Sequence, residues 1–382
     1  MKRLIGLVLA VVLLVAVFPL GAKAADLQVA AKSAVLMDVA TGTVLYEQDA
    51  KAPLAPASVT KVMTMLLIME AIDSGKIRWE DMVTASEEAA AKGGSQVYLK
   101  VGESMSVEDM VKAIAVSSAN DCACAMAEHI AGSEAAFVEK MNARAKELGM
   151  ENTHFVNCTG LDDSEEAKEH KTSAYDIGIM SRELLKNHPD IKKYTTIWMD
   201  TLRNGTFGLS NTNKMVRFYS GATGLKTGFT SSAGYCLSAS AEREGMELVA
   251  VVMGSETSPK RFAACKNLLD YGFANFALVQ PEMPEDLSVP VTLGKESSVL
   301  AVPASQEGLL IDKGQKNEVS VETELEESVA APVSKGQRLG TMRILVGKQI
   351  VKEIPLIAEN GVARLSFSDI FLQMLRKLTM SK

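Results

Sequence analysis

Ser58 and Lys61 lie three residues apart in the segment Ser58-Val59-Thr60-Lys61. They fall in a predicted helix over residues 55–72. Residues with this spacing share one face of a helix, so the pair would place a hydroxyl beside an amine. Serine is a weak nucleophile unless a base lies within hydrogen-bonding reach, and lysine can be that base when burial lowers its pKa. Pro56 favours a helix start here, where backbone N–H groups stabilise developing negative charge. The same spacing also occurs on solvated helix faces.

A second group of polar residues, Ser118-Ala119-Asn120, falls where the helical pattern of residues 106–131 is interrupted. The interruption predicts a loop between two helices. The hydroxyl of Ser118 could relay a proton there, and the amide of Asn120 could hold a substrate carbonyl. The alternative is that Ser118 only caps a helix.

A third group, Lys226-Thr227-Gly228, lies on the predicted strand 224–229. Gly228 would let a substrate backbone approach the strand closely. Lys226 offers a positive charge and Thr227 a hydroxyl for an anionic group. A phosphate-binding P-loop is excluded, because it needs Gly directly before the Lys and Leu225 stands there.

Each motif is weak evidence alone, but the three occur in the order found in penicillin-binding proteins and class A β-lactamases. Over nearly its whole length the sequence resembles the low-molecular-weight penicillin-binding proteins, which are serine-type D-alanyl-D-alanine carboxypeptidases of the peptidase S11 family. The run from Asn211 to Phe229 is most like the DacF-type carboxypeptidases of spore-forming bacteria. Ala119 stands where the family commonly has Gly, and a methyl group there should be tolerated.

The resemblance implies a catalytic role for three side chains. Ser58 would be acylated by the carbonyl of the penultimate D-Ala, Lys61 would be its base, and Ser118 would pass a proton to the leaving amine. The backbone N–H groups of Ser58 and Phe229 would form the oxyanion hole.

The resemblance also implies the substrate-binding residues. Asn120 would hold the amide side of the substrate, while Lys226, Thr227 and Gly228 would line its carboxylate end. An arginine after the last hairpin meets the terminal carboxylate in this family, and Arg261 matches it. The alternative is an exposed arginine on a helix.

The predicted elements are two N-terminal strands, a block of helices, three later strands and a closing helix near 259–273. This order predicts one antiparallel sheet with helices on its faces and with its first and last strands adjacent. The resemblance implies an α/β (α+β) penicillin-binding/β-lactamase-like transpeptidase domain at 25–277. Short strands punctuated by glycines predict a small all-β domain at 278–362.

The two ends of the chain predict its location. Lys2 and Arg3, the uncharged run 4–20 and Ala22-Lys23-Ala24 are typical of a signal peptide covering residues 1–24, although an uncleaved anchor is the alternative. We therefore expect an exported, extracytoplasmic protein.

The last segment, 363–382, predicts an amphipathic helix. Its apolar residues recur at helical spacing and suit peripheral attachment to the outer face of the cytoplasmic membrane. Docking onto the second domain is the alternative. The apolar residues are Phe367, Ile370, Phe371, Met374, Leu375 and Leu378.

Composition narrows the partners. A net charge of −7 without a basic block argues against nucleic acid. Five cysteines leave at least one unpaired, and we expect them to be buried apolar side chains. The histidines and cysteines lack zinc-site spacing, so no metal and no cofactor are expected.

We therefore expect an enzyme that trims the terminal D-Ala from peptidoglycan stem pentapeptides and that β-lactams acylate as covalent inhibitors. A serine β-lactamase is one alternative, although the only Glu-x-x-x-Asn after the second motif in the helical region is Glu183…Asn187, at a helix end. A catalytically inactive cell-wall binding protein is the other, and the intact pair of Ser58 and Lys61 argues against it.

Overall fold

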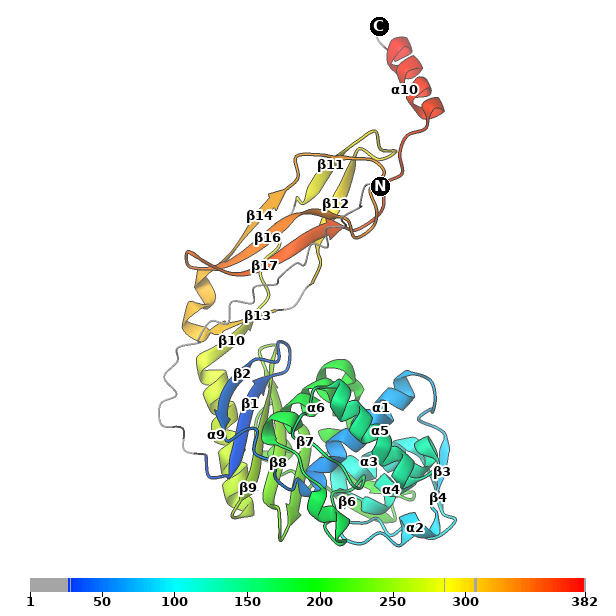
Figure 1. Cartoon of the computed structure of the whole chain (residues 1–382), viewed down its shortest axis with the longest axis vertical. Helices are drawn as coiled ribbons and strands as arrows, with labels where there is room; N and C mark the ends of the chain where they lie inside the picture. Colours follow the sequence, from blue (N-terminus) through cyan, green and yellow to red (C-terminus); the bar gives the residue numbers. More distant parts are fainter. Residues whose placement is uncertain (1–26, 28, 285, 306–307, 381–382) are drawn as a thin grey trace, which may run out of the picture. The chain divides into compact units, whose positions relative to one another are not determined.

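The computed structural model describes residues 27, 29–284, 286–305 and 308–380. The chain forms two compact units that divide between Leu278 and Val279, here called the N-terminal and C-terminal units (Figure 1). The predicted signal peptide at 1–24 lies outside the described residues. Across the described ranges, no helix is long and apolar enough to cross a membrane.

A five-stranded antiparallel sheet organises the N-terminal unit, with strand order β2-β1-β9-β8-β7. The first strand, β1, pairs with the last strand, β9, from Ser33 opposite Met253 to Asp38 opposite Leu248, so the predicted adjacency is confirmed. Both strands are buried on both faces, which explains their continuous apolar sequences. The strands are β1 (Ser33–Asp38), β2 (Val44–Gln48), β7 (Ala222–Thr230), β8 (Gly234–Arg243) and β9 (Met246–Ser255).

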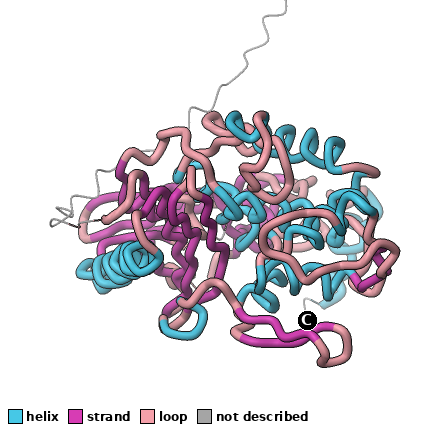
Figure 2. Tube along the Cα trace, turned by 90° about the horizontal axis from the view of Figure 1, so that it is seen from below, coloured by secondary structure: helices cyan, strands magenta, loops and turns pink. Residues whose placement is uncertain are grey.

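Helices cover both faces of this sheet, and a helical block extends from one of them (Figure 2). The main helices are α1 (Lys61–Asp73), α3 (Val107–Ser117), α4 (Asn120–Ala131), α5 (Glu134–Glu147), α6 (Ala174–Asn187) and α9 (Ser258–Asn275). Short elements complete the unit: α2 (Glu87–Ala90), α7 (Lys192–Thr195), α8 (Met215–Phe218), β3 (Met82–Thr84), β4 (Ser104–Ser106), β5 (Met199–Leu202), β6 (Phe207–Ser210) and the 3-10 turns η1 (Ala57–Thr60), η2 (Glu166–Glu169) and η3 (Pro189–Ile191).

Two glycines show how the helices meet the sheet. Gly178 of α6 lies against Val35 and Met37, whereas Gly272 of α9 lies against Leu36. Successive residues of a strand point to opposite faces, so α6 and α9 pack on opposite sides of β1. The central helix α1 contacts α6 and is buried almost all round, as its apolar composition requires.

The helix predicted over 55–72 differs from the structure at its start. Residues 57–60 form the 3-10 turn η1, and α1 begins only at Lys61. The backbone of Ala57 has a φ of +49°, a left-handed value that cannot belong to an α-helix. The predicted break between two helices near Ser118 is confirmed, because α3 ends at Ser117 and α4 begins at Asn120.

The C-terminal unit contains a six-stranded sheet with strand order β14-β16-β17-β12-β11-β15. Its core includes the buried side chains of Val289, Leu339, Ile344 and Leu356, which confirms the predicted all-β fold. Its elements are β11 (Ser288–Thr292), β12 (Ser298–Pro303), β13 (Leu309–Asp312), η4 (Lys313–Glu318), β14 (Val319–Leu325), β15 (Val329–Ala330), β16 (Arg338–Val346), β17 (Gln349–Ala358) and α10 (Phe367–Met380). The short strand β10 (Phe276–Val279) includes the point at which the chain divides into the two units.

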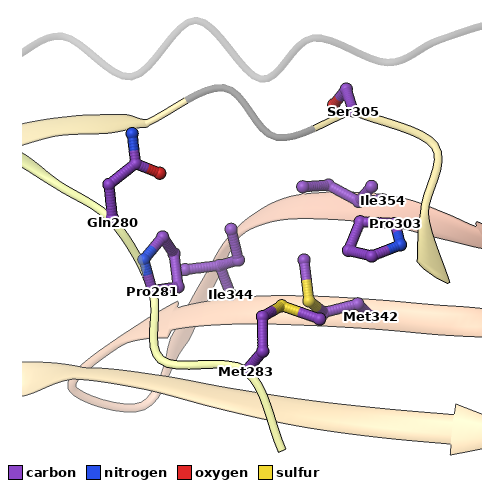
Figure 3. Close-up of a pocket in the computed structure, with 8 residues that line it drawn as sticks. All are labelled: Gln280, Pro281, Met283, Pro303, Ser305, Met342, Ile344 and Ile354. Atoms are coloured by element: carbon purple, nitrogen blue, oxygen red, sulfur yellow. The ribbon is translucent and has the colours of Figure 1, made fainter. Parts of the chain in front are cut away.

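A cavity of about 330 Å³ opens on this sheet (Figure 3). Met342, Ile344 and Ile354 form its floor, and Pro281 and Met283 face them from the segment before β11. None of the described residues that line it is charged. Its polar lining side chains are Gln280 and Ser305, so the described residues that line the cavity include no acid and no base.

Candidate active site

Ser58 and Lys61 are in direct contact where η1 passes into α1. The Lys61 Nζ donates to Ser58 Oγ over 3.0 Å and to the Thr159 carbonyl over 2.8 Å. Lys61 is 0% exposed. Burial lowers the pKa of Lys61 to about 7, against the opposing fields of Cys158 and Asp121. The pair is therefore a hydroxyl next to an amine that can be neutral near pH 7.

Two glycines hold the turn that carries Ser58. A Cβ at Gly160 would lie 1.9 Å from the carbonyl oxygen of Ala57, and one at Gly228 would lie 2.6 Å from that of Pro56 and 3.1 Å from the backbone nitrogen of Ser58. The distances of 1.9 Å and 2.6 Å are to backbone atoms and are too short for a Cβ, so any residue other than glycine would force the backbone to move. Gly228 is needed because the strand β7 approaches the backbone of the turn that carries Ser58 this closely.

The second motif forms a tight corner between α3 and α4. Ser118 has a φ of +64°, and its hydroxyl is buried without a hydrogen-bond partner among the described residues, as is Oδ1 of Asn120. The side-chain amide of Asn120 donates to the Gly93 carbonyl over 2.7 Å. The alternative that Ser118 is a helix N-cap is wrong, because Ala119 occupies the N-cap position of α4; Ser118 is the C-cap residue of α3, and its hydroxyl makes no capping bond. Both unpaired atoms are available to a substrate.

The third motif lies on β7. The Nζ of Lys226, which is buried, donates to the Thr227 carbonyl over 2.9 Å. Burial holds the pKa of Lys226 well below its usual range, and the charges of Lys61 and Arg261 add to this effect. The hydroxyl of Thr227 donates to that of Thr212 over 2.7 Å.

Arg261 is buried beside the same strand. It is 7% exposed, and its Nη1 donates to the carbonyls of Gly228 over 2.9 Å and Cys236 over 3.2 Å. Its Nε is buried and has no partner among the described residues. Burial lowers the pKa of Arg261. The alternative of an exposed helix arginine is therefore wrong.

Phe229 follows Gly228 on β7, and its side chain is half exposed. Its ring stacks on Tyr235 at 4.3 Å between centroids, and the Arg261 guanidinium lies 5.4 Å from the centre of the Tyr235 ring. Within the described parts of the chain, none of Lys61, Lys226 and Arg261 forms an ion pair with a carboxylate. This end of the site lacks a counter-charge and suits an anion.

Sequence reasoning missed the loop that contacts Lys61. The Thr159 carbonyl accepts from Lys61, and the side-chain oxygen of Asn157 accepts from the backbone N–H groups of Thr159 and Gly160. The Asn157-Cys-Thr-Gly160 run is a turn signal that could have marked this loop, although not its partner. Asp121 was also missed. It is buried and accepts from the backbone of Val97 and Leu99.

Two groups of acidic and metal-ligating side chains occur elsewhere in the described structure. Each already surrounds a cation of the chain. Lys92 contacts Glu88 and Glu134, and Arg144 contacts Glu70 and Glu183. Each cluster therefore already holds a cationic side chain of the chain itself.

Comparison with known proteins identifies the family. Residues 21–257 match the family described as D-alanyl-D-alanine carboxypeptidase, peptidase S11, and residues 283–364 match the C-terminal domain of penicillin-binding protein 5. The chain belongs to the peptidase S11 family of D-alanyl-D-alanine carboxypeptidases. The family, the fold class and the activity predicted from three short motifs are thereby confirmed.

Relatives match over most of their length. The D-alanyl-D-alanine carboxypeptidase DacF of Bacillus subtilis is 42% identical over 379 residues, covering 96% of each chain. DacA of Escherichia coli is 34% identical, covering 89% of this chain and 85% of DacA.

Solved structures agree with this assignment. Penicillin-binding protein 5 of Haemophilus influenzae superposes with a TM-score of 0.75 at 32% identity, over 88% of this chain and 98% of that one. Penicillin-binding protein D2 of Listeria monocytogenes, solved with ampicillin bound, superposes with a TM-score of 0.59 at 33% identity. The match covers 65% of this chain and 99% of that one.

Lys61→Met should stabilise the protein, and more so at pH 6 than at pH 9. The pKa of Lys61 is lower in the folded state, at about 7, than in the unfolded chain, so the unfolded state binds more protons between the two values and stability rises with pH there. The destabilising effect of Lys61 is therefore largest below pH 7 and declines above it. Thermal unfolding at both pH values measures this. A variant that is less stable than wild type at both would contradict the prediction.

Proposed function

We propose that Ser58 and Lys61 carry out the D-alanyl-D-alanine carboxypeptidase reaction on peptidoglycan stem pentapeptides through a Ser58 acyl-enzyme. The observation that carries this assignment is the 3.0 Å contact between Ser58 Oγ and a fully buried Lys61 amine with a pKa of about 7. An amine with this pKa is partly neutral at physiological pH and can accept the serine proton.

In the acylation step, Ser58 Oγ attacks the carbonyl carbon of the penultimate D-Ala while Lys61 takes its proton. The Thr159 carbonyl, 2.8 Å from Nζ, stabilises the ammonium that forms. The backbone N–H groups of Ser58 and Phe229 donate to the developing oxyanion. The C–N bond then breaks, the proton held by Lys61 passes through the hydroxyl of Ser118 to the leaving amine, and free D-Ala departs. Water attacks the ester by the reverse proton movements, and the shortened peptide leaves.

Substrate recognition uses the uncompensated cations. The carboxylate of the terminal D-Ala would supply the counter-charge that Lys226 and Arg261 lack, with Thr227 donating a hydroxyl bond. The amide group of Asn120 would hold the peptide on the other side. The expected role of Gly228 in substrate approach gives way to another: the missing Cβ lets the turn that carries Ser58 lie against β7.

β-Lactams are proposed as covalent inhibitors that acylate Ser58. The Listeria relative was solved in ampicillin-bound and cefotaxime-bound forms, which supports this proposal. The β-lactamase alternative lacks support, because Glu183 is held by Arg144 over 2.7 Å and the matching relatives are named as carboxypeptidases.

Export and membrane attachment are also proposed. The signal-peptide pattern at 1–24 supports export. The apolar side chains of Phe367, Phe371 and Met374 on α10 are exposed, which supports an apolar helix face available to the outer leaflet of the cytoplasmic membrane.

Ser58→Ala should abolish both labelling by a fluorescent penicillin and release of D-Ala from a diacyl-tripeptide ending in D-Ala-D-Ala, while the melting temperature changes little. In wild type, the acylation rate should rise with pH with a midpoint near 7, because neutral Lys61 is the base. Lys61→Ala should acylate slower by about 10²–10⁴-fold. Ser232→Ala, on the nearby turn, is the matched serine control and should keep labelling. Covalent labelling of Ser58→Ala would show that another residue is the nucleophile.

Arg261→Ala should lower kcat/KM for peptides ending in D-Ala-D-Ala by roughly ten- to several-hundred-fold, or about 1.5–3 kcal/mol for one charge-assisted contact. Penicillin acylation should fall less, because the strained ring supplies part of the driving force. Arg261→Lys should keep only part of the wild-type kcat/KM, since lysine lacks the guanidinium fork. Lys260→Ala, at the exposed neighbour, is the control. An equal loss on a substrate with an amidated C-terminus would show that Arg261 does not recognise the carboxylate.

A chain ending at Leu365 should become soluble without detergent and keep its activity on soluble peptides, because α10 serves only attachment. The end point lies beyond Val362, which is buried in the core and pairs with Val333. Membrane fractionation of full-length and shortened protein measures the effect. Retention of the shortened protein on membranes would contradict an anchoring role for α10.

A further inference from the structure

A buried hydrogen-bond chain runs from the loop before α6 to the turn that carries Ser58. The backbone N–H of Val156 donates to Nδ1 of His170 over 3.1 Å, and Nε2 of His170 lies 2.9 Å from Oγ1 of Thr60. The Thr60 hydroxyl donates to the carbonyl of Ala57 over 2.8 Å. His170, Thr60 and Ala57 are all buried.

The direction of every bond in this chain is fixed by its first member. A backbone N–H can only donate, so Nδ1 of His170 must be an acceptor and the imidazole must be neutral. The ring proton is then on Nε2, which donates to Thr60 Oγ1. Thr60 in turn has its own proton left for the Ala57 carbonyl. Each bond therefore has one possible direction, and the three bonds can form together only with this tautomer of His170.

The chain ends at a critical point of the backbone. Ala57 has a φ of +49°, directly precedes Ser58, and its carbonyl oxygen is the atom that Gly160 approaches. Thr60 directly precedes Lys61. The two residues that the chain joins are therefore the ones that directly precede Ser58 and Lys61.

We propose that His170 is a positioning residue, which as a neutral donor to Thr60 holds the 57–60 turn so that Ser58 Oγ and Lys61 Nζ stay at reacting distance. This inference rests on the proposed roles of Ser58 and Lys61. In the described structure His170 makes no hydrogen bond to either of them, and it acts through Thr60 and Ala57. A left-handed backbone in a non-glycine residue is costly and persists only when its surroundings enforce it, and this chain is one such constraint.

The surroundings keep the imidazole neutral. Burial lowers the pKa of His170 to about 4, with the charges of His154 and Lys61 adding to the effect. The edge-to-face ring of Phe155 packs at 5.6 Å. The neighbouring Glu169 and Lys171 are exposed to solvent. Protonation would place a second proton between Nδ1 and the Val156 N–H, so the chain would break.

The test compares variants of the full-length protein. His170→Phe keeps an aromatic ring without the bonds, and Thr60→Val keeps the shape of Thr60 without its hydroxyl. His170→Gln and Thr60→Ser retain groups that can make the bonds. His154→Gln, at an exposed histidine nearby, is the matched control. The readouts are the second-order rate of acylation by a fluorescent penicillin, normalised to the labelled fraction, kcat and KM for a D-Ala-D-Ala peptide, and the melting temperature.

We expect His170→Phe and Thr60→Val each to slow acylation by about 10–100-fold, as displacement of reacting groups does, with KM changed by less than about twofold. His170→Gln, Thr60→Ser and His154→Gln should stay within about threefold of wild type. The double variant His170→Phe/Thr60→Val should be no slower than either single variant, because both break one chain.

Wild-type acylation rates in His170→Phe or Thr60→Val would overturn the inference, as would losses that multiply in the double variant. A variant with a lower melting temperature but a normal acylation rate per folded molecule would show that His170 only stabilises the fold. That result would also overturn the inference. Failure of the proposed function gives a different result: wild type would not label, or Ser58→Ala would. The two failures are thus distinguishable.

Discussion

The burial of the Lys61 ammonium is the constraint on which the rest of the site depends. An amine at its ordinary pKa would be protonated and could not accept the serine proton. Complete removal from water brings the pKa to about 7, and the two hydrogen bonds to Ser58 and Thr159 hold the group in place. The apolar helix α1 and the loop around Thr159 together enclose it. The same burial opposes folding, as is common where a site must keep a group in an unfavourable state.

Backbone contacts, more than side chains, join the helical block to the sheet at this point. Gly160 approaches the carbonyl of Ala57, and Gly228 approaches the backbone of Pro56 and Ser58. Gly228 belongs to the strand β7, so this contact ties the turn that carries Ser58 to a rigid element. The buried chain through His170 adds a third constraint to the same four-residue turn.

The site also contains cationic side chains that have no carboxylate partner among the described residues. The charges of Lys61 and Arg261 lower the pKa of Lys226, and no carboxylate of the described residues pairs with any of the three. In the proposed function, the free carboxylate at the end of the substrate would supply the missing counter-charge. An internal peptide bond brings no such charge, which gives a physical reason for a preference for chain ends.

The sequence by itself determined the motif-bearing elements, the fold class and the family. Ser58, Ser118 and Lys226 belong to local patterns that helices, loops and strands impose on the chain, and such patterns are readable without coordinates. The order of strands and helices predicted the adjacency of β1 and β9 for the same reason.

Only the tertiary structure decided how the motifs act together. Thr159, Gly160 and His170 meet the 57–60 turn from about a hundred residues away in the chain, and no spacing rule links them to it. The sequence therefore predicted a regular helix over 55–72, whereas packing against Gly160 and Gly228 accompanies a 3-10 turn with a left-handed Ala57. The burial of Arg261 was equally undecided, because its helix pattern permits either face. Local sequence specifies which residues could do chemistry, but burial, which sets their pKa values, is a property of the whole fold.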